Sequence, residues 1–336
     1  MKIGYFGSPE ISAQLLQALL DDGEHEIVCV VSNADRPRGR SKQLVPTEVA
    51  RLALEREIPL YRFESLKGAG PPAELAAHEA ELFVVFAYGK IMPASIFDLP
   101  PRGTINLHAS LLPLLRGASP IQSSLLQGFT TTGWTVQSMV QKMDAGDIIS
   151  QNTVDITLED TTATLTDKLM PAGIDLVRAT LRDFDERFAA KQEQDHDAAT
   201  YCTKILPDDA RVDWTRSTAD IHNLIRAFAP KPLAWTTTDK GRLKLHGSRL
   251  PAADDVAVWL LNGGVGAESR ETWSANPGTV LVGREGKKLK MLVVTGDGLL
   301  EVTELQPENR KPMAAGDFLN GSRIQSGARL GEADSG

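Results

Sequence analysis

The 336-residue chain has a globular composition, with 42% hydrophobic and 24% charged residues, enough for a sizeable core over about two domains. Its net charge of −8 argues against a protein that coats nucleic acid non-specifically, because such binding needs a positive surface. The two cysteines predict no disulfide framework, and no stretch predicts a secretion signal or a membrane-spanning segment, so we expect a soluble, cytoplasmic protein.

The start of the chain predicts a β-α-β unit. An apolar run at residues 2–7 is followed by apolar residues at helical spacing over residues 9–22 and by a second apolar run at residues 26–32. This order predicts a parallel sheet with right-handed crossover connections. The glycine pattern G-x-G-x-x-G of dinucleotide-binding proteins is absent here, which argues against a nicotinamide site.

A basic segment follows at residues 33–46. It is rich in turn-forming residues and has no apolar period, so we expect a long loop that projects from the edge of the sheet. Four cations lie within seven residues of it, namely Arg36, Arg38, Arg40 and Lys42. Such a run is most often a solvated surface, but it also suits contact with phosphate groups, and composition alone leaves both interpretations open.

The remainder of the first domain predicts further strands and helices around one sheet. The apolar run at residues 82–89 is continuous, which predicts a central strand buried on both faces. The other predicted elements, in chain order, are a helix at 46–57, a strand at 60–63, helices at 71–80 and 93–98, a strand at 103–108, a helix at 118–127, a strand pattern from 134 that breaks near 144, a strand at 150–156 and a long helix at 160–186.

The second half of the chain has a different pattern. Residues 188–207 are polar and aperiodic and predict a linker between a first domain at 1–187 and a second at 208–324, with a frayed tail at 325–336. After a helix at 217–229, short strands separated by Gly, Pro and Asn predict a small β-barrel. These strands are expected at 234–238, 242–248, 257–261, 278–283, 288–294 and 299–305.

Two polar residues stand at the end of the strand predicted at 103–108. Asn106 and His108 are two positions apart, so on a strand their side chains lie on the same face. A loop rich in Pro and Gly follows, and the ligands of open α/β sheets bind outside the carboxyl ends of the strands. A histidine at a strand end also commonly caps or packs, so spacing alone leaves its role open.

A carboxylate on a tight turn, Asp144, supplies a chemical partner for this pair at the same sheet edge. An amide donor, an imidazole and an acid suit acyl transfer, because donors stabilise a developing oxyanion and a carboxylate orients the imidazole. No G-x-S-x-G elbow and no cysteine beside His108 supplies a nucleophile, which favours direct attack by an amine of the substrate. The histidines and cysteines show no metal-ligand spacing, so we expect no metal.

These residues carry a resemblance to the folate-dependent formyltransferases. The matching stretches are Asn-Leu-His-Ala-Ser-Leu-Leu-Pro at 106–113, Arg-Gly-Ala-Ser-Pro-Ile-Gln at 116–122 and Asp-Ala-Gly-Asp at 144–147, and residues 6–9 and 87–89 also fit. The basic loop at 35–42 and motifs of the second domain narrow the resemblance to the members that act on methionyl-tRNA. Those motifs are Arg-Ala-Phe-Ala-Pro at 226–230, Trp235, Pro-Gly-Thr at 277–279 and Thr-Gly-Asp-Gly at 295–298.

The resemblance implies a Rossmann-like parallel-sheet catalytic domain followed by an OB-like β-barrel domain that binds tRNA. It implies an enzyme that transfers the formyl group of its co-substrate, 10-formyltetrahydrofolate, to the α-amine of methionyl initiator tRNA. Asn106, His108 and Asp144 match the catalytic trio of the family. The implied folate-binding positions are Phe86, Ala87, Tyr88, Gly89, Ser110, Leu111, Leu112 and Pro113, and the implied tRNA-binding positions are Arg36, Arg38, Arg40 and Lys42. We expect no membrane partner and a monomer.

The chain also departs from the family pattern. Leu114 and Leu115 stand where a basic and an aromatic residue are usual, Trp134 replaces a small aliphatic residue, and Lys231 stands where an aromatic residue is common. Three other functions remain as alternatives at this point. A sibling enzyme would formylate a sugar nucleotide or hydrolyse 10-formyltetrahydrofolate, without needing the basic loop and a tRNA-type barrel. A tRNA- or folate-binding module without catalysis would not need the trio.

Overall fold

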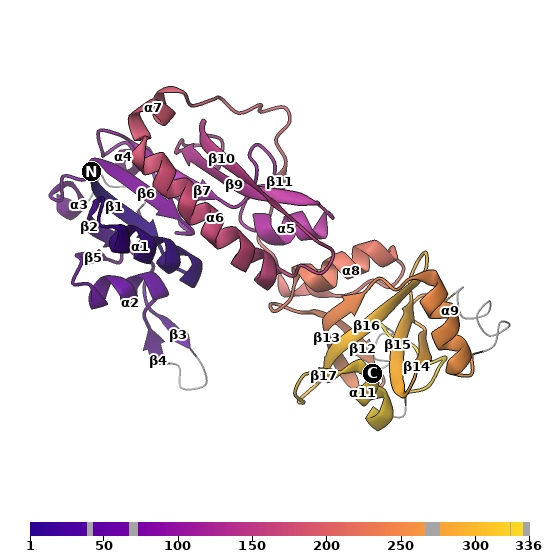
Figure 1. The fold of residues 1–336 in the computed structure, drawn as a ribbon. Coiled ribbons are helices and arrows are strands. Elements are labelled where there is room, and N and C mark those ends of the chain that lie inside the picture. The colour runs from indigo at the N-terminus through magenta and orange to yellow at the C-terminus, as the bar shows by residue number, and fades with distance from the viewer. Residues whose placement is uncertain (39–42, 67–72, 266–275, 323, 332–336) are drawn as a thin grey trace. The chain divides into compact units, whose positions relative to one another are not determined.

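The structure, a computed structural model, divides into two compact units. The N-terminal unit consists of Met1–Pro120, Thr131–Asp155 and Thr166–Lys204, and the C-terminal unit consists of Ile121–Thr130, Ile156–Leu165 and Ile205–Gly336. The structure describes residues 1–38, 43–66, 73–265, 276–322 and 324–331. Each unit is built around a sheet of its own (Figure 1).

A seven-stranded sheet forms the centre of the N-terminal unit, in the order β10-β9-β7-β6-β1-β2-β5. Strands β7, β6, β1, β2 and β5 run parallel, which confirms the β-α-β prediction, whereas β9 pairs antiparallel with both β7 and β10, so the sheet is mixed. These strands are β1 (Lys2–Gly7), β2 (Glu26–Val31), β5 (Leu60–Tyr61), β6 (Leu82–Phe86), β7 (Thr104–His108), β9 (Thr131–Ser138) and β10 (Ile148–Asp155). Strand β6 is fully buried at the middle of the sheet, as its continuous apolar run predicts.

Helices cover both faces of this sheet, as two successive residues of β1 show. The Tyr5 hydroxyl donates to the Ser12 carbonyl of α1 at 2.7 Å, while Phe6 packs on the other face in a cluster with Ile96 and Phe97 of α4. The helices of the described chain are α1 (Glu10–Asp22), α2 (Glu48–Glu55), α3 (Ala73–Ala76), α4 (Ala94–Phe97), α5 (Pro120–Leu126), α6 (Thr162–Arg182), α7 (Phe184–Ala189), α8 (Thr218–Ala227), α9 (Ala253–Asn262) and α11 (Ala315–Ser322), with a 3-10 turn at Pro207–Ala210.

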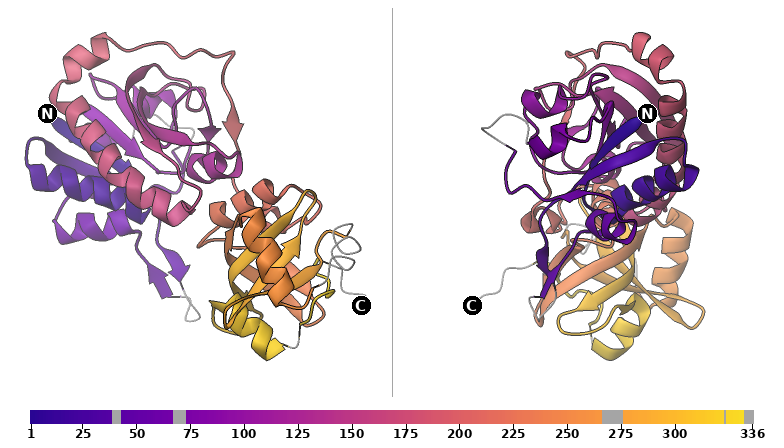
Figure 2. Two further views of the ribbon diagram at one scale, coloured as in Figure 1. Left: turned by 45° about the vertical axis from the view of Figure 1, so that its right-hand side comes forward. Right: turned by 90° about the vertical axis from the view of Figure 1, so that its left-hand side faces the viewer.

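The basic segment is not a plain loop, and that prediction was wrong. Strands β3 (Arg36–Arg38) and β4 (Gln43–Val45) pair antiparallel as a hairpin that stands out from the seven-stranded sheet (Figure 1, Figure 2). The sequence hides this hairpin because its strands are only three residues long and one carries Pro37, which argues against a strand. Residues 39–42, with Arg40 and Lys42, lie outside the described residues.

The expected linker is folded onto the N-terminal unit rather than free. Helix α7 extends into it, Gln192 pairs with Ile148, and β11 (Tyr201–Cys202) pairs in parallel with β8 (Arg116–Gly117). Within it, the side chain of Gln194 is only 3% exposed. Most other polar residues of the segment are exposed, so Gln194 is an exception that binds protein backbone and side chains.

The C-terminal unit contains an antiparallel sheet in the order β12-β13-β16-β15-β14, with β17 paired to β16. Its strands are β12 (Ala234–Thr238), β13 (Gly241–Arg249), β14 (Val280–Glu285), β15 (Lys288–Val294), β16 (Leu299–Pro307) and β17 (Met313–Ala314). The first and last strands of this order do not pair with each other, so the described residues form a sheet where a closed barrel was expected. Helix α8 confirms the helix predicted at 217–229, and the Ser217 side chain caps it by accepting from the Asp220 N–H at 3.1 Å.

Two other predictions for this unit were wrong. Residues 257–261 belong to helix α9, because a short apolar run does not distinguish a buried helix from a strand, whereas Asp254 and Asp255 in its first turn favour a helix. The tail is not frayed as far as residue 331. Leu330 is buried, and its N–H donates to the Gly278 carbonyl at 2.9 Å.

No helix within the described ranges is long and apolar enough to cross a membrane.

Candidate active site

The candidate site lies at the C-terminal end of β7. Asn106 and His108 lie two positions apart on this strand, as predicted, and therefore share one of its faces. In the antiparallel pairing with β9, Asn106 is opposite Gln137 and His108 is opposite Thr135. Opposed residues have neighbouring side chains, so β9 adds two polar groups to the predicted pair. Asn106 is half-buried and His108 is 6% exposed.

The His108 ring is held in one tautomer by the loop that follows it. Its Nε2 atom lies 2.9 Å from the Leu115 carbonyl oxygen, and because a carbonyl only accepts, Nε2 donates this hydrogen bond. The unprotonated nitrogen of the neutral ring is therefore Nδ1. This atom lies 3.7 Å from Oδ1 of Asp144. Nδ1 is thus the atom of the ring that can accept a proton, and the charge it faces is a carboxylate.

Asp144 is fixed by the turn on which it lies. Its backbone has a φ of 50°, in the left-handed region that residues other than glycine seldom adopt. Its Oδ1 accepts a hydrogen bond from Nε2 of Gln137 at 3.0 Å, and its Oδ2 accepts one from the backbone N–H of Gly117 at 2.8 Å. The Asp144 side chain is 14% exposed. These bonds hold the carboxylate toward the imidazole rather than toward solvent.

The loop after β7 is held by side chains of β9 and β10. The Thr135 hydroxyl donates to the Ser110 carbonyl at 2.7 Å and accepts from the Leu112 N–H at 3.1 Å. Nε2 of Gln151 donates to the Leu112 carbonyl at 2.9 Å. The loop then turns through Leu115, which has a φ of 57° and a buried side chain. Leu115, one of the two leucines that depart from the family pattern, therefore fills an apolar position with its side chain. Its carbonyl accepts the hydrogen bond from the His108 imidazole.

The turn after β6 lies at the same edge of the sheet. Nδ2 of Asn33, which follows β2, donates to the Tyr88 carbonyl at 2.7 Å and to the Ser8 hydroxyl at 2.8 Å. Ala87 and Gly89 are exposed and have φ values of 52° and 74°. Tyr88 is 2% exposed, and its burial raises the pKa of the phenol to about 12. The backbone of this turn is thus open at the sheet edge, while its phenol stays neutral in the core.

The segments predicted to bind folate follow neighbouring strands. Val85 of β6 pairs with Asn106 of β7, so residues 86–89 and 110–113 leave the sheet side by side. Several of their side chains are buried, namely those of Phe86, Tyr88, Ser110 and Leu112. Phe86 packs edge-on against Trp134 with ring centroids 5.4 Å apart, so its side chain belongs to the core.

Of the four cations predicted to contact tRNA, Arg40 and Lys42 lie outside the described residues. Arg36 and Arg38 are in β3, but the structure does not describe the side chains of residues 36–43. In the described part of the chain, no group of three or more His, Cys, Asp or Glu residues could hold a metal ion.

Three residues that support the site were not predicted from the sequence, namely Gln137, Arg116 and Gln194. Gln137 could have been suspected, because it lies in the strand with alternating polar and apolar residues before the Asp144 turn. Its position opposite Asn106 depends on the register between β7 and β9, which a local pattern does not determine. Arg116 and Gln194, which lie behind the turn, gave no signal for this position. Their contacts join segments more than 40 residues apart, which no local pattern reports.

Comparison with known families and proteins gives a consistent result. Residues 1–180 match the formyl transferase family, and residues 204–323 match the formyl transferase C-terminal domain. The chain is 42% identical over 334 residues to the methionyl-tRNA formyltransferase of Leptospira interrogans, covering 98% of this chain and 100% of that protein. It is 38% identical over 332 residues to the methionyl-tRNA formyltransferase of Bacillus subtilis, covering 98% of each.

Solved structures share the fold at lower identity. The sugar 3N-formyl transferase WlaRD has a TM-score of 0.60 at 17% identity, covering 93% of this chain and 99% of that one. HypX from Aquifex aeolicus, solved in complex with tetrahydrofolic acid, has a TM-score of 0.59 at 18% identity and covers 96% of this chain, which spans only 48% of HypX. The domain matches and the full-length relatives show more than a shared fold. They show that the chain belongs to the formyl transferase family, among the methionyl-tRNA formyltransferases.

Proposed function

We propose that this chain transfers the formyl group of 10-formyltetrahydrofolate to the α-amine of methionine on initiator tRNA. The observation that carries the proposal is the arrangement of Asn106, His108 and Asp144 at the end of β7. The full-length relatives named methionyl-tRNA formyltransferase support the acceptor, and the HypX complex with tetrahydrofolic acid supports the folate donor.

The proposed reaction is a direct transfer from folate to amine. The neutral amine attacks the formyl carbon and forms a C–N bond, and the bond from that carbon to N10 of the folate breaks when the tetrahedral intermediate collapses. His108 takes the proton of the amine at Nδ1 and returns it to N10, while Asp144 stabilises the protonated ring. The Asn106 amide and the protonated ring stabilise the oxyanion. No covalent enzyme intermediate is needed.

We propose that the folate binds along residues 86–89 and 110–113. These segments follow the adjacent strands β6 and β7, in which Val85 pairs with Asn106. The exposed backbone of Ala87 and Gly89 offers donors and acceptors to a pterin ring, because the side chains of this turn are small or turned into the core.

For the domains we propose a catalytic domain at 1–187, a connecting segment at 188–207, an OB-like tRNA-binding domain at 208–324 and a tail at 325–336. One observation supports an OB-like closure of the second sheet. Residues 328–331 bind both edge strands of this sheet. The Val280 N–H of β14 donates to the Ala328 carbonyl at 2.8 Å, and the Gly331 N–H donates to the Thr237 carbonyl of β12 at 3.0 Å. We also propose a monomer that acts on tRNA in the cytoplasm.

An exposed basic face of the C-terminal sheet supports a tRNA-binding role for that unit. Trp235 of β12 pairs with Lys244 of β13 and forms an isolated bridge with Arg211, so the three residues lie side by side. The Arg242 guanidinium lies 3.9 Å from the ring centroid of Trp235, and that of Arg211 lies 5.7 Å from it. These residues line a pocket of about 730 Å³, to which Glu308 also contributes. Cations around an aromatic ring suit a nucleic-acid backbone and its bases.

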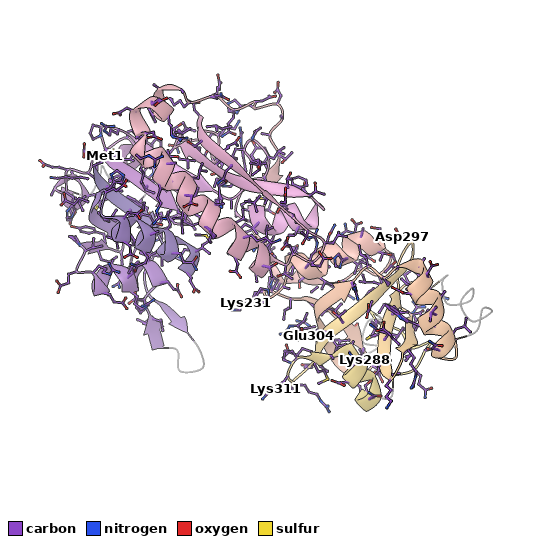
Figure 3. All side chains as sticks on the ribbon, viewed as in Figure 1. Met1, Lys231, Lys288, Asp297, Glu304 and Lys311 are labelled. Carbon is purple, nitrogen blue, oxygen red and sulfur yellow. The ribbon has the colours of Figure 1, made fainter. Side chains whose placement is uncertain are left out.

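Replacing Arg242 by alanine is expected to raise KM for methionyl-tRNA and to reduce the salt dependence of tRNA binding by about one phosphate contact. Turnover at saturating tRNA should not change, because this face carries none of the proposed chemistry. Lys288→Ala is the matched control, since Lys288, which Figure 3 labels, is an exposed cation of β15 that does not line the pocket. An Arg242→Ala variant with the salt dependence of the wild type would refute the role of this face.

We propose that the basic segment at residues 33–46 binds tRNA as well. Arg40→Ala is expected to weaken the use of tRNA and to lower the salt slope, because a guanidinium that binds a phosphate releases counterions. Steady-state kinetics with methionyl-tRNA at several salt concentrations measure this effect. Equal slopes for the variant and the wild type would exclude Arg40 from the tRNA contact.

One assay tests the proposed function against its alternatives. The chain is mixed with 10-formyltetrahydrofolate and, in separate reactions, with charged initiator tRNA, an amino sugar nucleotide or water alone, and release of tetrahydrofolate is followed. Release is expected only with the charged tRNA. Release with the sugar nucleotide or with water alone would show one of the sibling activities, and no release in any reaction would show a binding module.

A further inference from the structure

A buried glutamine in the segment after α7 holds the turn that carries Asp144. Gln194 is 3% exposed, and its Nε2 donates to the carbonyl of Asp144 at 2.9 Å and to that of Gly146 at 2.6 Å. All three residues lie in the N-terminal unit. The connecting segment therefore binds the backbone of the same residue whose carboxylate faces His108.

A buried arginine fixes the orientation of this glutamine. The Arg116 side chain is fully buried, and its Nε and Nη2 donate to Oε1 of Gln194 at 3.0 and 2.6 Å. Nη2 also donates to Nδ1 of His196 at 2.9 Å. A guanidinium only donates, so the oxygen of the Gln194 amide faces Arg116 and its NH₂ group faces the Asp144 turn.

The turn that carries Asp144 needs the restraint that Gln194 provides. Asp144 has a φ of 50°, a conformation that costs a residue with a side chain of order 1 kcal/mol and persists only where the surroundings impose it. The turn is packed tightly on one side, because a Cβ at Gly146 would lie 1.7 Å from the Ser138 carbonyl oxygen. On the other side, Gln194 binds the carbonyls of two turn residues. Loss of those bonds lets Asp144 relax and moves its carboxylate away from the imidazole.

We propose that Gln194 is a positioning residue for formyl transfer, which acts by holding Asp144 at His108. This proposal rests on the proposed function, because it assigns Asp144 a part in the reaction. Gln194 does not itself touch the reacting atoms. Its bonds make the connecting segment a part of the catalytic unit, although its composition resembles that of a linker.

A double-mutant cycle tests this role. Gln194→Met removes the amide while keeping the chain length, and it is expected to lower kcat about 10- to 100-fold with KM for both substrates little changed. In the Asp144→Asn background the same change should lower kcat by less than about 3-fold, because the group that Gln194 positions is already lost. An equal loss of kcat in the two backgrounds would show a merely structural role and overturn the proposal.

Two further variants separate positioning from folding. Gln194→Glu keeps an acceptor for Arg116 but has no donor for the turn, so it should lose kcat, and its unfolding midpoint shows whether the variant is folded in the assay. Wild-type kcat in this variant would also overturn the proposal. Gln192→Met is the matched control, because the exposed Gln192 pairs with Ile148 through its backbone alone and its substitution should leave kcat unchanged.

The cycle also distinguishes this proposal from the proposed function. If Asp144→Asn alone keeps wild-type kcat, the catalytic assignment of Asp144 fails, and the role of Gln194 fails with it. If Asp144→Asn lowers kcat while Gln194→Met does not, only the role of Gln194 fails.

Discussion

Asp144→Asn is expected to lower kcat about 10²- to 10⁴-fold with little change in the free energy of unfolding. The amide of asparagine keeps the size of the side chain but removes the negative charge 3.7 Å from Nδ1 of His108. The positive charge that His108 carries during proton transfer from amine to folate then has no carboxylate beside it. His108→Ala should give a loss of the same order. Single-turnover formylation of methionyl-tRNA measures both.

The control for this prediction is the other carboxylate of the same turn. Asp147 binds Lys191 at 2.5 Å and makes no contact with the imidazole among the described interactions, so Asp147→Asn should keep wild-type turnover. Thermal unfolding of each variant shows whether the fold is retained. Near-wild-type turnover of either Asp144→Asn or His108→Ala would contradict the assignment of the site.

Trp134→Ala is expected to destabilise the N-terminal unit by about 3–5 kcal/mol, the cost typical of removing a buried aromatic side chain. Trp134 is fully buried, and its Nε1 donates to the Leu169 carbonyl of α6 at 2.7 Å. Its ring also packs edge-on against Phe86 of the central strand. The substitution leaves a cavity between sheet and helix, and urea unfolding followed by circular dichroism measures its cost.

A glycine of α6 explains how this large residue fits where the family has a small one. A Cβ at Gly173 would lie 2.8 Å from Cε2 of Trp134, so the indole occupies the space that a side chain would need. Gly173→Ala should therefore destabilise the wild type and cost less in the Trp134→Ala background. Trp235→Ala is the control, because that tryptophan is half-buried on a sheet face and its removal opens no closed cavity. A cost below about 1 kcal/mol for Trp134→Ala would contradict this packing.

The elements that sequence patterns predicted have a local signal that favours one conformation. The run of β6 is rich in Val and Phe, which favour strands, and α1 has apolar residues at helical spacing over several turns. Helix α9 and the β3–β4 hairpin are short, and their residues suit more than one conformation. Their structures depend on contacts with the rest of the fold, which local patterns do not contain.

The residues of the candidate site also divide into those that a local pattern predicts and those that depend on the rest of the fold. Asn106 and His108 were predicted because the two-residue period of a strand puts them on one face, and Asp144 because a turn follows the neighbouring strand. The Leu115 carbonyl and the Gln194 amide could not be predicted, because they reach the site through a backbone turn and a packed segment. The polar residues of that segment are indistinguishable in sequence from those of a solvated linker.

The most direct test of the account follows the formyl carbon itself. The chain is given 10-formyltetrahydrofolate labelled at that carbon, together with charged initiator tRNA. The account predicts that label appears on the α-amine of the methionine in step with tetrahydrofolate release, and never on the protein. Label bound covalently to the protein during turnover, or tetrahydrofolate release without labelled tRNA, would contradict direct transfer at the end of β7.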